Sequence, residues 1–128
     1  MVGVFQFRSL PILKVRLIEI FEGESTKILV AGGAGYLGSV PVPRLLERGY
    51  SVDVVELFWF GNHLPNAVGI LNKDILDLSV EDLRPYEQVI FLAGLSNDPM
   101  DEFSPSRNFI FDAAAPAFLA YTSPRGPW

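Results

Sequence analysis

Three glycines, Gly32, Gly35 and Gly38, are spaced three residues apart directly after the apolar residues 28–30. Because glycine has no Cβ, this spacing lets the chain turn tightly, bring bare backbone up to a pyrophosphate and start a helix packed closely on a sheet. The pattern therefore predicts a strand, a phosphate-binding loop and a helix. A glycine-rich turn that binds no ligand is the alternative.

An acidic residue follows the glycine loop at the distance that a dinucleotide site requires. Residues 51–56 form a second apolar strand ending in Glu56, about 20 positions after the loop. Between them, residues 45–49 close a helix at the glycine stop Gly49. We expect Glu56 to accept hydrogen bonds from the adenosine ribose. Its charge would repel the extra phosphate of NADP, so NAD is the expected cofactor.

These motifs resemble the extended short-chain dehydrogenases/reductases, specifically the NAD-dependent nucleotide-sugar epimerases and dehydratases. The similarity runs from about Lys27 to the C-terminus and also includes residues 73–77 and the strand 88–93, which ends beside Gly94. The resemblance implies an α/β Rossmann-type doubly wound sheet that binds NAD, with a nucleotide sugar as substrate. In complete family members the chemistry is hydride transfer at a sugar carbon.

The resemblance also implies roles for particular residues. Asp74 and Ile75 would contact the adenine, while Ala93 and Gly94 would line the dinucleotide. The alternative for Asp74 is a solvated turn before a helix capped by Ser79. For Ala93 and Gly94 the alternative is simple packing at the end of the strand. The expected cofactor-binding residues are Gly32, Gly35, Tyr36, Leu37, Gly38, Glu56, Asp74, Ile75, Ala93 and Gly94.

The chain has 128 residues, enough for one domain but fewer than a complete member of this family needs. We expect the first half of the sheet, with strand order 3-2-1-4, and a helix over residues 108–121. The family's Tyr-x-x-x-Lys pair is absent, and the nearest imitation, Tyr121 to Arg125, is interrupted by Pro124. We therefore predict no catalytic residue, and expect Tyr121 to pack on the sheet.

Two positions depart from the family pattern. Pro41 and Pro43 follow the glycine loop, where a proline inside the helix would loosen it and weaken the pyrophosphate site. The family also carries an asparagine near the start of its later helix, and either Asp112 or Asn108 falls at that position.

Residues 1–25 lie outside the resemblance. We expect them to form an N-terminal extension, followed by an NAD-binding Rossmann half-domain over residues 26–128. Residues 13–17 alternate apolar and charged side chains as a half-buried strand does, and Pro11 separates them from an earlier short strand. This extension is either a β segment that pairs with the sheet or a partner, or a leader. Because the strand at 89–92 would expose an unpaired edge, we expect a homo-oligomer.

Composition excludes several classes. The net charge of −5 comes without a basic patch, which argues against nucleic acid binding, and no apolar run approaches a membrane span. The chain has no cysteine and one histidine, His63, so we expect neither a disulfide nor a metal site. No secretory signal is recognisable, so a cytoplasmic location is expected.

Two interpretations stay open at this point. The aromatic residues 58–60 either pack over an adenine or a partner, or plug the sheet edge. The chain is either the cofactor-binding part of an enzyme or a noncatalytic module that binds a dinucleotide or self-associates.

Overall fold

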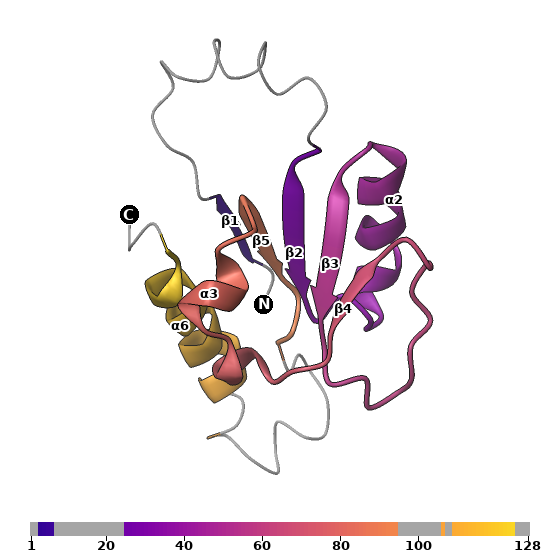
Figure 1. Cartoon of the computed structure of the whole chain (residues 1–128). Coiled ribbons are helices and arrows are strands. Elements are labelled where there is room, and N and C mark those ends of the chain that lie inside the picture. Colours follow the sequence, from indigo (N-terminus) through magenta and orange to yellow (C-terminus); the bar gives the residue numbers. More distant parts are fainter. Residues whose placement is uncertain (1–2, 7–24, 95–105, 107–108, 125–128) are drawn as a thin grey trace, which may run out of the picture.

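A computed structural model describes residues 3–6, 25–94, 106 and 109–124. It contains a five-stranded sheet in the order β1-β5-β2-β3-β4 (Figure 1). The strands are β1 (Gly3–Gln6), β2 (Lys27–Ala31), β3 (Ser51–Val55), β4 (Gly69–Leu71) and β5 (Gln88–Phe91). Strands β2 to β5 are parallel, and counted along the chain they have the predicted order 3-2-1-4.

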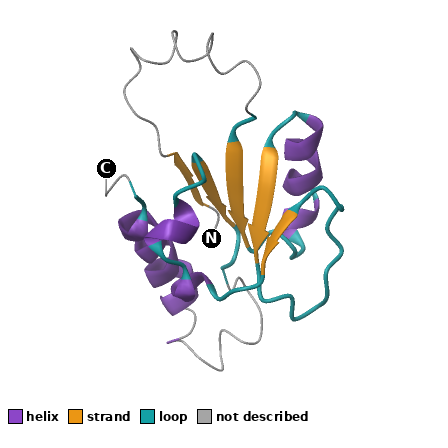
Figure 2. Ribbon diagram, in the orientation of Figure 1, coloured by secondary structure: helices purple, strands orange, loops and turns teal. Residues whose placement is uncertain are grey.

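Helices cover both faces of the sheet (Figure 2). Helix α2 (Pro41–Glu47) lies on one face, and α3 (Val80–Leu83) and α6 (Ala115–Thr122) lie on the other. Short helical turns occupy Leu37–Ser39 (η1), Ile75–Asp77 (η2) and Ile110–Ala114 (η3). This layered arrangement confirms the predicted Rossmann-type fold.

The two faces follow from alternation along the buried strands. In β2, Ile28 and Val30 pack with Val42 of α2, whereas Leu29 and Ala31 pack on the opposite face in the cluster that includes Leu119 of α6. Because both faces are covered, the central strand β2 is apolar and buried from Ile28 to Ala31 rather than alternating with polar residues. This packing fixes where the ends of the strands lie.

The edge of β5 is covered by the chain's own N-terminus. Strand β1 pairs with it antiparallel, so that Gly3 is opposite Phe91 and Gln6 is opposite Gln88. Residues 13–17, which we expected as a strand, lie outside the described residues. Since β5 is paired on both sides, the reason given for self-association at this edge is removed.

The segment after the glycine loop differs from the predicted helix. Residues Leu37–Ser39 form a 3₁₀ turn, and the α-helix begins only at Pro41. A longer α-helix would leave the carbonyls of Leu37 and Ser39 without donors, because Pro41 and Pro43 have no N–H. The expectation that Pro41 loosens a helix interior was wrong, since it occupies the first turn, where proline is tolerated. Gly49 ends the helix as predicted, with φ +84°.

The later helix also begins irregularly. A helix was predicted over residues 108–121, and the structure has a π-helical turn at Ile110–Ala114 followed by α6. Pro116 explains the irregularity, because it cannot donate an α-helical hydrogen bond to the carbonyl of Asp112. Tyr121 is 76% exposed, so the expectation that it packs on the sheet was wrong.

Ser79 caps α3 as predicted. Its hydroxyl accepts a hydrogen bond from the amide of Asp82 at 3.2 Å, and the Asp82 carboxylate accepts one from the amide of Ser79 at 2.9 Å. Lys73 lies 2.9 Å from the same carboxylate. Hydrogen bonds from the Ser79 amide, and then from Lys73 and the Ser79 hydroxyl, lower the pKa of Asp82 to about 2.

A polar cluster lies at the amino end of the parallel strands, away from the glycine loop. The buried Tyr86 donates a hydrogen bond from its hydroxyl to Oδ2 of Asp53 at 2.6 Å, and Nζ of Lys27 lies 3.0 Å from the same oxygen. A Cβ on Gly69 would collide with the Asp53 carboxylate, so a larger residue there would displace this carboxylate from its partners. These residues connect the beginnings of four parallel strands.

Candidate dinucleotide site

The predicted cofactor residues meet at one edge of the sheet. The glycine loop follows β2, Glu56 follows β3, Asp74 follows β4, and Ala93 and Gly94 follow β5. Because these strands are parallel, their carboxyl ends share the edge at the bottom of Figure 1. Ligands of open α/β sheets bind at this edge, where the order of the strands reverses.

Gly32 holds the loop against two neighbouring strands. Its φ is +77°, its amide donates a hydrogen bond to the carbonyl of Val55 at 2.9 Å, and a Cβ there would lie 2.6 Å from the Cα of Ala93. No other residue fits this conformation and this space without rearrangement. Gly32 therefore places the start of the loop between the ends of β3 and β5.

Gly38 has a different role from the one predicted. A Cβ at this position would collide with the backbone of Gly33, including its carbonyl oxygen. The 3₁₀ turn therefore rests on the glycine loop itself, rather than beginning an α-helix that packs on the sheet. The close approach that we expected from this glycine is present, but its partner is the loop.

Gly35 is the glycine that the described fold does not require. It is exposed, its φ is not in the left-handed region, and a Cβ there would lie 3.5 Å from its nearest neighbour, the carbonyl oxygen of Gly32. The amides of Gly33, Ala34 and Tyr36 donate no hydrogen bond to any residue that the structure describes. The loop thus has exposed backbone at Gly35, beside amides that have no partner among the described residues.

Tyr36 and Leu37 flank this surface. Tyr36 is 93% exposed and Leu37 is also exposed. The hydroxyl and amide of Ser39 donate to the carbonyl of Tyr36 at 2.7 and 3.4 Å, which fixes the turn that follows. The side chains of Tyr36 and Leu37 are therefore available at the rim of the loop.

Glu56 is held at the end of β3 with part of its carboxylate free. Its amide donates to the carbonyl of Leu71 at 3.1 Å, and its Oε1 accepts from the amide of Leu57 at 3.1 Å. Oε2 accepts no hydrogen bond from a described residue. The half-buried side chain can thus accept from a ligand hydroxyl with its second oxygen.

Asp74 and Ile75 have structural roles at the same edge. Oδ1 of Asp74 accepts a hydrogen bond from the amide of Leu76 at 2.9 Å and caps η2. Ile75 packs into the core beneath. The turn interpretation of Asp74 is therefore accurate, and its contact with adenine stays a prediction.

Asp112 is one of the two residues that could correspond to the family's asparagine near the start of the later helix. Its side chain contains a buried acceptor. Its Oδ1 is shielded from solvent and has no hydrogen-bond partner among the residues that the structure describes. It lies in the π-helical turn, whose form follows from Pro116. Asn108, the other candidate, is outside the described residues.

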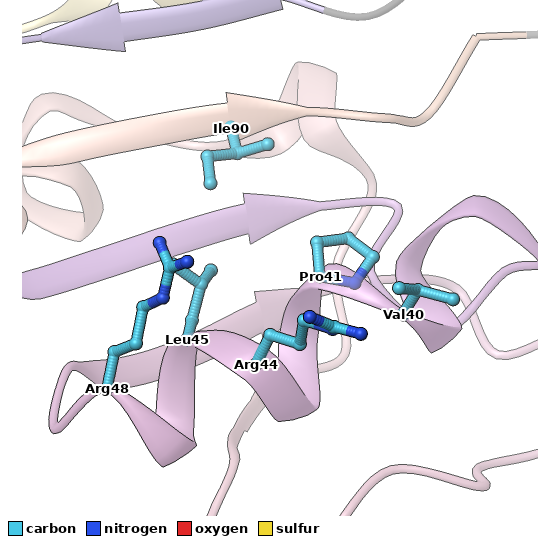
Figure 3. A pocket seen from close by; sticks show the side chains of 6 residues that line it. All are labelled: Val40, Pro41, Arg44, Leu45, Arg48 and Ile90. Atoms are coloured by element: carbon cyan, nitrogen blue, oxygen red, sulfur yellow. The ribbon is translucent and has the colours of Figure 1, made fainter.

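A shallow groove of about 290 Å³ lies on the α2 face of the sheet (Figure 3). Ile90 points from β5 towards α2, which contributes the other wall. The lining residues are Val40, Pro41, Arg44, Leu45, Arg48 and Ile90. The groove follows α2 from Val40, which adjoins the turn after the glycine loop, to Arg48 at the end of the helix.

His63 is exposed, and the described part of the chain contains no group of three or more His, Cys, Asp or Glu residues that could hold a metal ion. Within the same part, no helix is long and apolar enough to cross a membrane.

Comparison with known proteins identifies the family. The model of the NAD dependent epimerase/dehydratase family matches residues 28–115, from the first parallel strand to the start of α6. The chain belongs to this family. The match includes the glycine loop, Glu56, Asp74, Ile75, Ala93 and Gly94. The resemblance predicted from the motifs is thereby confirmed.

Relatives of this family member are more than twice as long as this chain. UDP-glucose 4-epimerase of Corynebacterium glutamicum is 38% identical over 74 residues, which are 55% of this chain and 22% of that protein. UDP-glucose 4-epimerase 3 of Oryza sativa subsp. japonica is 36% identical over an alignment of 93 residues that covers 58% of this chain and 24% of that protein. The chain thus spans about a quarter of the length of these relatives.

Solved structures show the same relation. UDP-glucose 4-epimerase of Thermotoga maritima with UDP-glucose superposes with a TM-score of 0.66 at 27% identity, over 73% of this chain and 32% of that one. The UDP-glucose 4-epimerase of Thermus thermophilus in complex with NAD superposes with a TM-score of 0.61 at 26% identity, over the same shares. The chain is therefore similar to the N-terminal, dinucleotide-binding part of such enzymes.

Proposed function

We propose that this family member binds NAD at the carboxyl edge of its sheet. The free amides of the glycine loop would hold the pyrophosphate, and Glu56 would accept the hydroxyls of the adenosine ribose. Asp74 and Ile75 would contact the adenine, and Ala93 and Gly94 would line the dinucleotide. When bound, NAD supplies the acceptor for hydride transfer from a sugar carbon.

The exposed glycine Gly35 is the observation on which the proposal rests. Gly32 and Gly38 are explained by contacts within the protein, but Gly35 is not. A glycine that the fold does not need, flanked by amides without partners, fits a backbone that a pyrophosphate approaches closely. The carboxylate of Glu56, at the end of the neighbouring strand, has one oxygen without a hydrogen-bond partner among the described residues, which supports the same ligand. Its negative charge favours NAD over NADP.

A catalytic role has less support than cofactor binding in the residues of this chain. No Tyr-x-x-x-Lys sequence occurs in it, and Tyr121 is followed by Pro124 and Arg125 rather than by a lysine one helical turn later. An arginine stays protonated and lacks the compact ammonium of lysine. We propose that the chain supplies cofactor binding for a nucleotide-sugar epimerase or dehydratase reaction and does not turn over the sugar alone.

A noncatalytic module that binds a dinucleotide or self-associates is the second candidate. NAD binding is common to both candidates. Turnover of a nucleotide sugar by the chain with NAD would support the enzyme, whereas binding without turnover would support the module. A homo-oligomer stays a proposal; among the described strands, β1 and β4 form the two edges of the sheet.

The replacement Gly35→Val tests the glycine loop. A Cβ has room at this position of the fold, and the exposed valine methyls would occupy the space of the pyrophosphate. Thermal stabilisation by saturating NAD should therefore disappear, while the melting temperature without ligand changes little. Ala117→Val adds bulk at an exposed position of α6 and serves as the matched control. If Gly35→Val retained the NAD-induced stabilisation of the parent chain, the proposed site would be wrong.

A further inference from the structure

A tight turn directly after Glu56 presents two aromatic side chains to solvent. The amide of Gly61 donates to the carbonyl of Phe58 at 3.0 Å, which closes a β-turn with Trp59 and Phe60 at its centre. Trp59 is 65% exposed and Phe60 is 91% exposed. The expectation that these aromatics plug the sheet edge is therefore wrong for both residues.

The turn is held in an unfavourable backbone conformation. Phe58 has φ +56°, a region in which a bulky aromatic residue is rare, and Gly61 has φ +88°. The next residues are also fixed, since Oδ1 of Asn62 accepts from the amide of Leu64 at 3.0 Å. Strained backbone of this kind is concentrated at ligand clamps and similar sites. The two exposed aromatics thus lie on a hydrogen-bonded turn that begins at a strained residue.

The turn lies beside the proposed ribose position. Trp59 is three residues after Glu56, so their Cα atoms are separated by at most about 11 Å. The segment after β3 leaves the sheet at the same edge as the glycine loop (Figure 1). An adenine joined to a ribose at Glu56 would lie within reach of an indole side chain on this turn.

We propose that Trp59 stacks on the adenine ring of NAD and strengthens its binding. The inference rests on the proposed function, because it takes the position of the ribose from Glu56. Of the two exposed aromatics, Trp59 is the nearer to Glu56 in sequence and is partly covered by protein, whereas Phe60 is almost wholly in solvent. A flat indole recognises a base by its π-face without hydrogen bonds. Phe60 is therefore the matched control on the same turn.

The experiment uses fluorescence and calorimetry on the full chain. Replacing Trp128 by Phe leaves Trp59 as the only tryptophan, since the sequence has two. We expect NAD and AMP to quench its emission, and nicotinamide mononucleotide to leave it unchanged. By calorimetry, Trp59→Ala should weaken NAD binding about tenfold, the size of one base–aromatic stack. Trp59→Phe should recover most of that loss, and Phe60→Ala should change affinity less than twofold.

The outcomes separate this inference from the proposed function. If NAD binds the parent chain but Trp59→Ala binds it equally well and the emission does not change, the stacking is wrong and the dinucleotide site stands. If Phe60→Ala causes the larger loss, the assignment to Trp59 is overturned. Absence of NAD binding by the parent chain would refute the proposed function, and the stacking with it. Circular dichroism of each variant verifies that it is folded.

Discussion

The hydroxyl of Tyr86 gives a prediction that isolates stability from function. Tyr86→Phe removes one oxygen atom from a buried ring and leaves the packing of that ring intact. The lost interaction is the 2.6 Å hydrogen bond to the carboxylate of Asp53. This cluster lies at the amino end of the strands, so the replacement should leave NAD binding unchanged.

The magnitude follows from the surroundings of Asp53. A hydrogen bond to a charged acceptor contributes about 1.5–3 kcal/mol. Lys27 stays 3.0 Å from Asp53 in the variant, and the carboxylate is 16% exposed, so water can partly replace the hydroxyl. We therefore expect a loss in the lower half of this range, about 2 kcal/mol, or a fall in melting temperature of roughly 8 °C for a domain of this size.

The same replacement should change the pH dependence of stability. Burial, and then the hydrogen bond to Asp53 and its negative charge, raise the pKa of Tyr86 far above its ordinary value of 10.0. A raised pKa means that the folded state keeps a proton that the unfolded state loses. The contribution of Tyr86 is thus complete below pH 10 and declines as the pH rises above it.

Urea unfolding of the parent chain and of Tyr86→Phe between pH 7 and roughly pH 11 measures both effects. The free-energy difference between them should be about 2 kcal/mol at pH 7. As the pH rises above 10, the parent should lose stability more steeply than the variant. Equal stability at pH 7, or an equal loss in alkali, would refute the role assigned to this hydroxyl.

Three further predictions concern other elements. The pKa of Asp82 is lowered to about 2, so its contribution to folding stability is complete above the unfolded pKa of 3.8 and is lost as the pH falls towards 2. Asp82→Asn should therefore reduce the acid-induced fall in the urea concentration at the unfolding midpoint. Pro41→Leu alone should alter the melting temperature little, whereas combined with Pro43→Leu it should extend α2 backwards, raise helical circular dichroism and strengthen NAD binding. Glu56→Gln should narrow the preference for NAD over NADP in a calorimetric comparison, and an unchanged preference would exclude Glu56 as its cause.

The assembly of the site was predictable because parallel topology determines it. Once the strand before Gly32 and the strand before Glu56 are recognised, their carboxyl ends must meet at one edge. The helix stop at Gly49 and the helix cap at Ser79 could also be predicted, because both depend on residues that are neighbours in the sequence. The helix stop and the helix cap are thus set by short stretches of sequence.

The errors arose where local information was insufficient. The sequence around Pro41 does not show whether this proline lies inside a helix or in its first turn. The helix starts at Pro41 because an earlier start would leave two carbonyls without the N–H donors that Pro41 and Pro43 lack. The bond between Asp53 and Tyr86 joins residues 33 positions apart, which no local pattern indicates. An aromatic run predicts burial by composition, but the positive φ of Phe58 turns the two residues after it outward.

Calorimetric titration of the parent chain with NAD, NADP and ADP-ribose tests the central claim most directly. The account predicts saturable binding of NAD and of ADP-ribose, because both contain the pyrophosphate and the adenosine ribose that the glycine loop and Glu56 would hold. NADP should bind more weakly, because its extra phosphate meets the Glu56 carboxylate. Absence of heat with all three ligands, in a chain shown to be folded, would contradict the dinucleotide site, and equal affinity for NAD and NADP would contradict the role of Glu56.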